Sequence, residues 1–342
     1  MTVGTPAKLI IQFMIPVFLG NIFQQFYNIA DSIVAGQFIG VKALAAIGST
    51  GSLMFFVTGW LNGLSSGFAI LVSQWFGAKQ YDKMRHYVAM SVYLAGGCAV
   101  LMTAGLLIAN EPILRMMNYS AEIMPEVKQY MGIIYAGLIV TAAYNSLAAF
   151  LRAIGDSKSP LYFLIISAVI NVALDVVFIV VFGMGVEGCA YATVIAQAIS
   201  ALLCFIYIVK KFPILHLTKS DRKISFQSFG RLLSLGIPMG LQFSITAIGT
   251  IIVQGAVNVY GETYMAGFSA AGKLQNMIMT VFVAFGATVA TYVGQNRGAG
   301  RMDRVKSGVR CTQVMILVWS VIAMAAVCFG GKYMTLAVYR SV

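Results

Sequence analysis

The chain has 342 residues, of which 59% are hydrophobic and only 10% are charged. Soluble domains carry about 25% charged residues, so this composition excludes an ordinary soluble protein. The formal net charge of +12 does not indicate nucleic-acid binding, because the basic residues alternate between connecting segments in the way that membrane topology produces.

Apolar runs of about 20 residues recur along the chain, long enough to cross about 30 Å of hydrocarbon as helices. They are continuous, which argues against a transmembrane β-barrel. The first run begins at Leu9 and reads as a span, not as a cleavable signal. We predict an all-α polytopic membrane protein. The nine predicted spans cover about residues 9–33, 44–72, 86–109, 128–151, 160–182, 188–209, 232–259, 265–294 and 308–330.

The charges of the connections predict the orientation of the chain. Alternate connections hold most of the 23 basic residues, and the richest of them lies between positions 210 and 231. Basic connections remain in the cytoplasm. We therefore expect a multi-pass protein of the cytoplasmic (inner) membrane with a cytoplasmic N-terminus, in contact with the lipid bilayer and not with nucleic acid.

A ten-residue segment after the second span recurs about 221 residues later. The segments Gln74–Lys83 and Gln295–Arg304 share the pattern Gln-x-x-Gly-Ala-x-x-x-Asp-basic, and Ile15-Pro16 falls near Ile237-Pro238. Convergent chemistry at helix ends is the alternative explanation, because glycine is common there. We interpret the match as an internal repeat.

The repeat predicts two six-helix bundles with the same orientation, related by an axis along the membrane normal. Residues 1–209 would form the N-terminal six-helix bundle, 210–231 a cytoplasmic basic linker, and 232–342 a partial C-terminal bundle of about three spans. The second bundle would need roughly 110 more residues to match the first. We therefore expect a chain truncated after about nine of twelve spans, or one that a partner completes.

The first span carries a polar stripe. Gln24, Tyr27, Asn28 and Asp31 are spaced i, i+3, i+4 and i+7, which places them on one helical face. A carboxylate inside the membrane usually faces an interior cavity and carries function. Alternatively, Asp31 marks the end of the helix at the membrane surface. Pro16 lies inside the same span and predicts a bend, because it cannot donate a backbone hydrogen bond.

The fifth span holds a second misplaced carboxylate, Asp175, with Asn171 one turn earlier on the same face. Thr193 of the sixth span could add a hydroxyl. Carboxylates in this setting can bind and release a proton, or ligate Na⁺ together with amide and hydroxyl oxygens. The alternative is a structural aspartate that is hydrogen-bonded to Asn171 or to another helix.

Taken together, these features resemble the multidrug and toxic compound extrusion (MATE) transporters over the whole chain. No single motif would suffice. The features that carry the resemblance are Pro16, the run Gln24–Asp31, Gln74-x-x-Gly77-Ala78, Leu151-Arg152-Ala-x-Gly155-Asp156, Asn171-x-x-x-Asp175 and Gly185-x-x-Gly188-x-Ala190-x-Ala192-Thr193.

The resemblance implies two bundles around a central cavity that alternates between inward-open and outward-open states. It implies export of amphipathic, often cationic drugs against entry of H⁺ or Na⁺, with no enzyme activity, no cofactor besides the coupling ion, and a monomeric transporter. The residues that match the coupling site are Tyr27, Asp31, Asn171, Asp175 and Thr193. The last four are candidate ligands of Na⁺. Pro16 is similar to the bending point of the first helix.

The second half departs from some branches of the family, which carry an acidic residue in the seventh span. Here the corresponding face offers only neutral polar groups, such as Gln242. Lys273 lies well inside the eighth span, where it either lines the C-terminal cavity or extends its amine to the membrane surface. Candidate cavity-lining residues are Gln24, Asn28, Gln242 and Lys273.

The sequence leaves three alternative functions open. A lipid-linked oligosaccharide flippase of the same superfamily would have a strongly basic cavity, whereas the interior of these spans holds Lys273 and no Arg. An intramembrane enzyme would need facing catalytic groups, but His86 and His216 lie at span ends, where we expect His86 to be solvated. The third alternative is a fragment that does not transport.

The five cysteines show no CxxC spacing and are expected to be packing residues.

Overall fold

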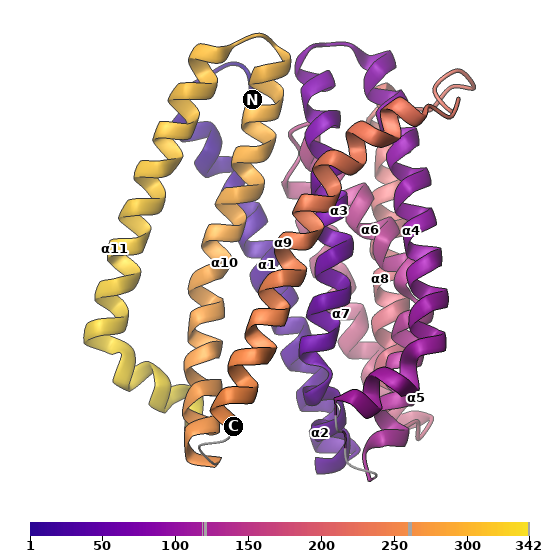
Figure 1. The fold of residues 1–342 in the computed structure, drawn as a ribbon, viewed down its shortest axis with the longest axis vertical. Coiled ribbons are helices and arrows are strands. Elements are labelled where there is room, and N and C mark those ends of the chain that lie inside the picture. The colour runs from indigo at the N-terminus through magenta and orange to yellow at the C-terminus, as the bar shows by residue number, and fades with distance from the viewer. Residues whose placement is uncertain (118, 120–121, 259–261, 341–342) are drawn as a thin grey trace.

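The computed structural model describes residues 1–117, 119, 122–258 and 262–340. This part of the chain is helical, without a strand, and most helices run along one common direction between two ends (Figure 1). The predicted all-α polytopic fold is confirmed. In chain order the elements are α1 (Pro6–Phe38), α2 (Val41–Ser49), α3 (Gly51–Gly77), α4 (Tyr81–Met116), α5 (Met124–Ala136), α6 (Leu138–Ala153), α7 (Lys158–Val176), η1 (Val177–Val181), α8 (Val186–Lys211), η2 (Pro213–Leu215), α9 (Phe226–Asn258), α10 (Glu262–Gly298) and α11 (Met302–Arg340).

Eight helices of the described chain are long and apolar enough to cross a membrane, and the number reaches nine when α5 and α6 count as one span with a 47° bend. This agrees with the nine predicted spans. The second predicted span differs at its start, because α2 is a separate short helix. The break lies at Thr50, whose hydroxyl donates to the carbonyl of Ile47 at 2.7 Å. Such a local side-chain bond competes with helical backbone pairing.

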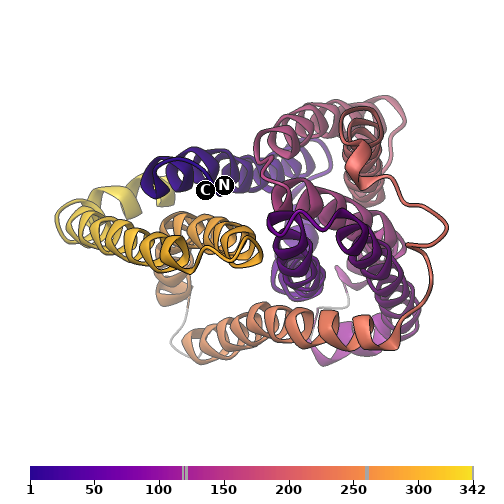
Figure 2. The same ribbon diagram turned by 90° about the horizontal axis from the view of Figure 1, so that it is seen from above.

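The elements gather around α1 and α3. Viewed from above, α1 runs beside the pair α10–α11 and reaches the first half, where it packs on α7, while α10 packs directly on α3 (Figure 2). Three buried apolar clusters lie mainly within α1–α8. A smaller one joins α10 to α1, with Ile10 among its fully buried members. The first half of the chain therefore supplies most of the core.

Helix α9 crosses α3 diagonally, and glycines allow the close approach (Figure 1). A Cβ atom added at Gly63 would lie 2.6 Å from Gly240 Cα, and one added at Gly67 would lie 2.6 Å from Gly236 Cα. The glycines repeat every four residues on both helices. Small residues at that spacing let helix backbones touch in lipid, where packing replaces the hydrophobic effect.

The two copies of the repeated motif pack against each other where α3 and α10 end. A Cβ atom at Gly77 would collide with the backbone carbonyl of Gln295, and one at Gly298 would collide with that of Gln74. Each motif therefore presents its glycine to the glutamine backbone of the other. This reciprocal contact is the one that a two-fold relation between the two helices would produce, and it supports the proposed repeat.

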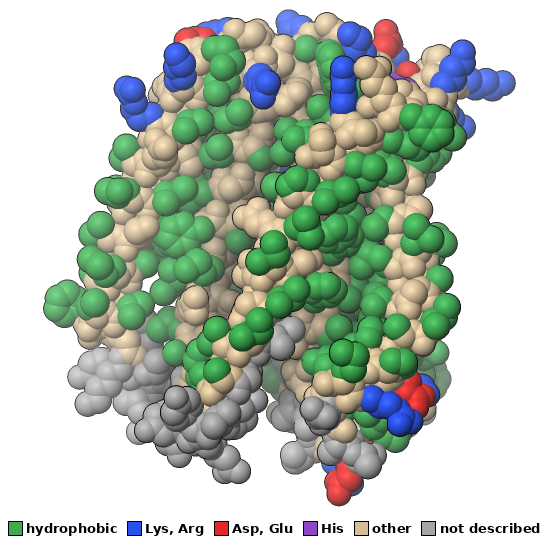
Figure 3. Space-filling model, viewed as in Figure 1, with side chains coloured by type: hydrophobic (Ala, Val, Ile, Leu, Met, Phe, Trp, Pro, Cys, Tyr) green, Lys and Arg blue, Asp and Glu red, His purple; other side chains and the backbone are tan. Residues whose placement is uncertain are grey.

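Lys and Arg side chains gather at the end of the molecule that carries the N-terminus (Figure 3). We call this the basic end. The α3–α4 and α10–α11 turns and the segment after α8 meet there. Helix α9 begins at Phe226, inside the range predicted as linker, so the extended part of that linker is shorter than expected.

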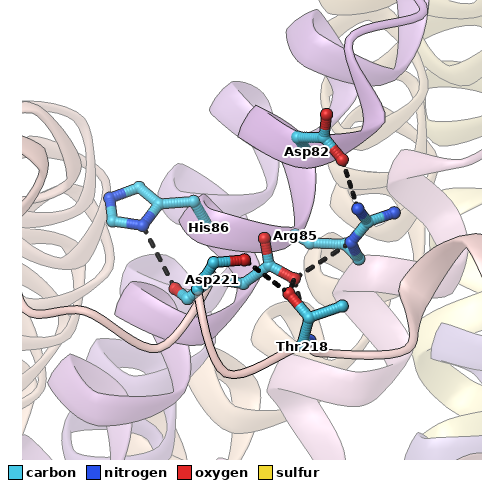
Figure 4. Close-up of polar contacts among 6 residues, drawn as sticks. Asp82, Arg85, His86, Thr218 and Asp221 are labelled. Atoms are coloured by element: carbon cyan, nitrogen blue, oxygen red, sulfur yellow. Dashed lines mark hydrogen bonds and ion pairs between the residues drawn. The ribbon is translucent and has the colours of Figure 1, made fainter.

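The linker is fastened to the start of α4 by a polar cluster (Figure 4). Asp221 accepts hydrogen bonds from Arg85 Nε at 3.0 Å, and from the Thr218 backbone N–H and hydroxyl at 2.8 and 2.6 Å. His86 Nδ1 lies 3.1 Å from the Asp221 carbonyl oxygen, and its Nε2 lies 3.0 Å from Ser228 Oγ. The expectation that His86 is solvated was wrong, because its ring joins α4 to the linker and to α9.

The same cluster fixes the charge of Asp221. Burial raises the pKa of this carboxyl, but the hydrogen bonds from Thr218 and the Arg85 guanidinium outweigh burial and hold the pKa below its ordinary value. Arg85 also pairs with Asp82, whose side chain is 91% exposed. The ionised Asp221 thus anchors the linker on α4.

Candidate functional site

Asp31 lies in the interior of the molecule. Its side chain is buried, and the Thr193 hydroxyl of α8 donates a hydrogen bond to Asp31 Oδ2 at 3.2 Å. Helix α1 continues past Asp31 to Phe38. The alternative in which Asp31 marks a helix end at the membrane surface was therefore wrong.

Asp175 and Asn171 lie on the face of α7 that is turned toward Asp31. Both residues have no exposed surface. The Asp175 and Asn171 side chains lie close enough to Asp31 to interact with its carboxylate. The structure thus brings together four residues that the sequence placed on three separate spans: Asp31, Asn171, Asp175 and Thr193.

Most polar atoms of this cluster have no partner. Asp31 Oδ1, both carboxylate oxygens of Asp175, and both amide atoms of Asn171 are buried without a hydrogen-bond donor or acceptor among the described residues. Two carboxylates accept but do not donate, so the Asp31–Asp175 contact becomes a hydrogen bond only when one of them carries a proton. Buried polar groups are normally satisfied, so this cluster suits a bound cation.

Two further buried residues adjoin the carboxylates. Tyr130 of α5 and Cys189 of α8 lie near enough to interact electrostatically with both Asp31 and Asp175. Neither residue was predicted as part of the site. No spacing or motif distinguishes Tyr130 from the other tyrosines of the chain. Cys189 was predicted only to be a packing residue, and no sequence pattern links it to the two carboxylates.

The backbone around the site is irregular in ways that set its geometry. Helix α7 ends at Val176 and continues from Val177, two residues after Asp175, as the π-helix η1, a form that often occurs at functional sites. A Cβ atom at Gly188 would lie 3.2 Å from Phe178 Cβ, so this glycine lets α8 pack on η1. At the α5–α6 bend, a side chain at Gly137 would collide with Val194. Together these contacts hold Thr193 beside Asp31.

Pro16, Gln24 and Gln242 lie outside this cluster. Pro16 lies within α1, which is helical on both sides of it. The side chains of Gln24 and Gln242 are exposed, and no described contact places them around a common cavity. The predictions for the side chains of Tyr27, Asn28 and Lys273 fall outside the described residues.

The donor atoms available at the site are carboxylate, amide and hydroxyl oxygens. In the described part of the chain, no group of three or more His, Cys, Asp or Glu side chains converges as a metal site, and no ion pair with Lys or Arg involves Asp31 or Asp175. All five cysteines are free. Oxygen donors of this kind suit a proton or a hard cation and not a soft transition metal.

Comparison with known proteins identifies the family of the chain. The MatE family matches residues 16–177 and 238–340. The chain is 32% identical over 308 residues to the "Probable multidrug resistance protein YpnP" of Bacillus subtilis (strain 168), covering 89% of this chain and 68% of that protein. It is 30% identical over 305 residues to the "Probable multidrug resistance protein YoeA" of the same organism, covering 87% and 66%.

The fold also matches a solved structure described as "Crystal structure of MATE in the bent conformation". The TM-score is 0.89 at 22% identity, covering 98% of this chain and 77% of that one. The chain thus spans about two thirds of the length of the two curated relatives. Because the family match covers most of the chain, and the match to YpnP covers 89% of this chain, the chain belongs to the MatE family of multidrug and toxic compound extrusion transporters.

Proposed function

We propose that this chain acts as a cation-coupled efflux antiporter, which exports amphipathic, often cationic drugs by alternating access. The relatives above are named as probable multidrug resistance proteins. The observation that carries the proposal is the buried pair Asp31 and Asp175, whose oxygens lack donors among the described residues.

Either H⁺ or Na⁺ can serve as the coupling ion at this pair. A proton on one carboxylate converts the Asp31–Asp175 contact into a hydrogen bond and removes one buried charge. A sodium ion would be ligated by the oxygens of Asp31, Asp175, Asn171 and Thr193, which offset the loss of its hydration shell. In both cases, cation binding stabilises the arrangement that holds α1, α7 and α8 together.

Coupling requires an element with two arrangements that the cation and the drug favour differently. Helix α1 is suited to this role because it contacts α7 near the site and also contacts α10 and α11 in the second half. Pro16 lies between the basic end and Asp31 and supplies a point where the helix can bend. We infer that cation binding at Asp31 favours one shape of α1 and drug binding favours the other.

The orientation follows from the charges. With the basic end in the cytoplasm of a bacterial cell, the α3–α10 contact closes the molecule on the cytoplasmic side. Drug would then leave toward the outer side while the cation enters from it. We place the N-terminus in the cytoplasm and the chain in the cytoplasmic membrane.

The test is dye efflux from proteoliposomes that contain the purified chain, with the pH and Na⁺ gradients collapsed separately. Ethidium is a suitable cationic probe. Collapse of one gradient should stop efflux, and collapse of the other should leave it unchanged, which identifies the ion. Efflux that continues at full rate without either gradient would contradict cation coupling. Absence of efflux under every gradient would contradict transport by this chain.

A further inference from the structure

A groove opens on the lipid-facing side of the molecule between α3, α4 and α9. It has a volume of about 570 Å³ and an apolar lining that includes Trp60, Phe68, Leu94, Leu101 and Ile237. The groove exists because α9 crosses α3 diagonally and so diverges from α4 toward the opposite end (Figure 1). Ligand pockets commonly measure about 300–1,000 Å³, so the groove can hold a chain-like apolar group.

The groove is about as long as one leaflet of a bilayer is thick. Its lining on α4 runs from Tyr93 to Met102, and Leu101 within that stretch is 75% exposed. At 1.5 Å per residue, this stretch of α4 is roughly 14 Å long. Half of a hydrocarbon core of about 30 Å is about 15 Å. An acyl chain whose headgroup lies at the basic end would therefore fill the groove.

Two cations lie between the groove and the basic end, on the ring pair Trp75 and Tyr87, which belongs to the same apolar cluster as the groove residues Phe68 and Leu94. Arg231 Nη1 donates to Tyr87 Oη at 3.3 Å, and the Tyr87 ring stacks on Trp75 with ring centroids 6.0 Å apart. Lys83 Nζ lies 4.7 Å above the Trp75 ring. Among the described ion pairs, neither Arg231 nor Lys83 has a carboxylate partner, because Asp82 and Asp221 both pair with Arg85.

We propose that this groove binds an anionic phospholipid from the leaflet at the basic end. The phosphate lies near Arg231 and Lys83, and one acyl chain lies against Trp60, Phe68 and Leu94. Basic side chains beside grooves between transmembrane helices recognise anionic headgroups in this way, and aromatic rings mark the headgroup level. The site shares no residue with the Asp31–Asp175 cluster, so it does not depend on the proposed transport function.

The three tryptophans of the chain provide the experiment. Trp60 lines the groove, whereas Trp319 lies on α11. Two single-tryptophan variants are prepared, one that keeps Trp60 (W75F with W319F) and one that keeps Trp319 (W60F with W75F). Each is reconstituted in phosphatidylcholine vesicles that contain a low mole fraction of a brominated lipid. The brominated lipid is either phosphatidylglycerol, which is anionic, or phosphatidylcholine, which is zwitterionic, and it quenches nearby tryptophan.

We expect brominated phosphatidylglycerol to quench Trp60 at a several-fold lower mole fraction than brominated phosphatidylcholine. Trp319 should be quenched equally by both lipids. In the Trp60 reporter, R231Q should remove the preference and R231K should retain it, which separates charge recognition from a folding defect. Equal quenching of Trp60 by the two lipids, or a preference that survives R231Q combined with K83Q, would overturn the proposal. If ethidium relieves the quenching of Trp60 by brominated lipid and unbrominated phosphatidylglycerol does not, the groove is a drug site and the proposal is overturned.

Discussion

The two halves of the chain share their helix-end motifs but not their membrane interior. Aligning Pro16 of α1 with Pro238 of α9 places Val253 at the position of Asp31. Asp31 is 4% exposed and hydrogen-bonded, whereas Val253 is 49% exposed. The residues that make helices touch at the basic end are thus retained in both halves, whereas a carboxylate at this position of the helix is present only in the first.

The halves also differ in whether a further helix packs over the helix pair that follows the first span. This pair is α3–α4 in the first half and α10–α11 in the second. In the first half, α6 packs on α3 and α4, and Ser65 Oγ lies 3.3 Å from Ser146 Oγ across that contact. A shift of about 221 residues turns Ser65 into Gly286, which lines an open groove of about 210 Å³ between α10 and α11. The helix pair of the first half is therefore covered by α6, whereas the corresponding pair of the second half carries an open groove.

The largest expected effect separates the two halves by function. Asp31→Asn and Asp175→Asn should each reduce gradient-driven ethidium efflux to the level of empty liposomes, because the site loses the negative charge that binds the cation. Val253→Ala, a change at the matched position of the second half, should retain efflux within about twofold, because an exposed position in a membrane-spanning helix tolerates another apolar side chain. Efflux rates normalised to reconstituted protein are the measurement. Full coupled efflux by both aspartate variants would show that the asymmetry has no functional role.

The next effect concerns the contact that the halves share. Gly77→Ala and Gly298→Ala should each lower the free energy of unfolding by about 1–3 kcal/mol, because the added methyl group collides with backbone. Gly105→Ala is the control, since nothing lies within 4 Å of its new Cβ, and it should gain up to about 1 kcal/mol. Denaturant titration followed by circular dichroism measures all three. Strict additivity in the double variant would argue against one shared contact.

A smaller effect is expected where the linker joins the halves. Asp221→Asn should cost roughly 1 kcal/mol at neutral pH, because it removes the charged acceptor of three hydrogen bonds from a side chain that is only 6% exposed. The folded-state pKa of Asp221 is lowered. Its contribution is therefore present above the ordinary value of about 4 and is lost as the pH falls through the lower folded value.

Thermal unfolding between pH 3 and pH 7 measures this contribution. As the pH falls from 7 to 3, the thermal stability of the Asp221→Asn variant should decrease less than that of the parent chain. Asp82→Asn is the matched control, since Asp82 contacts the same Arg85 but is largely exposed, and it should change stability by less than about 0.5 kcal/mol. An equal effect from both variants would mean that the linker anchor has no special role.

The smallest effect compares the covered helix pair with the open one. Ser65→Ala should cost about 1 kcal/mol, because Ser146 loses its partner across a buried contact. Gly286→Ala should be neutral or slightly stabilising, because its new Cβ meets no atom within 4 Å. Chemical unfolding of the two variants beside the parent chain gives the comparison. A clear loss of stability in Gly286→Ala would indicate that this groove is filled.

Hydropathy sufficed to predict the spans, because each must bury its backbone polar groups within one helix to cross a membrane. The site was partly predictable for a related reason. Asp31 and Asp175 stand out in apolar runs, and helical spacing places Asn171 on the face of Asp175. The remaining features depend on contacts between helices, which leave no local pattern. They include the break at Thr50, the π-helix η1, the nearby Tyr130 and the bridging His86.

The reciprocal contact of Gly77 and Gly298 has a further consequence. Each glycine meets the glutamine backbone of the opposite motif, so the two surfaces are self-complementary, as at the interface of a two-fold symmetric dimer. A protein built from the first motif alone could therefore associate with a second copy through the same surface. The contact inside this chain has the form of a dimer interface whose subunits are joined by the linker. A change that suits only one motif breaks the match for both.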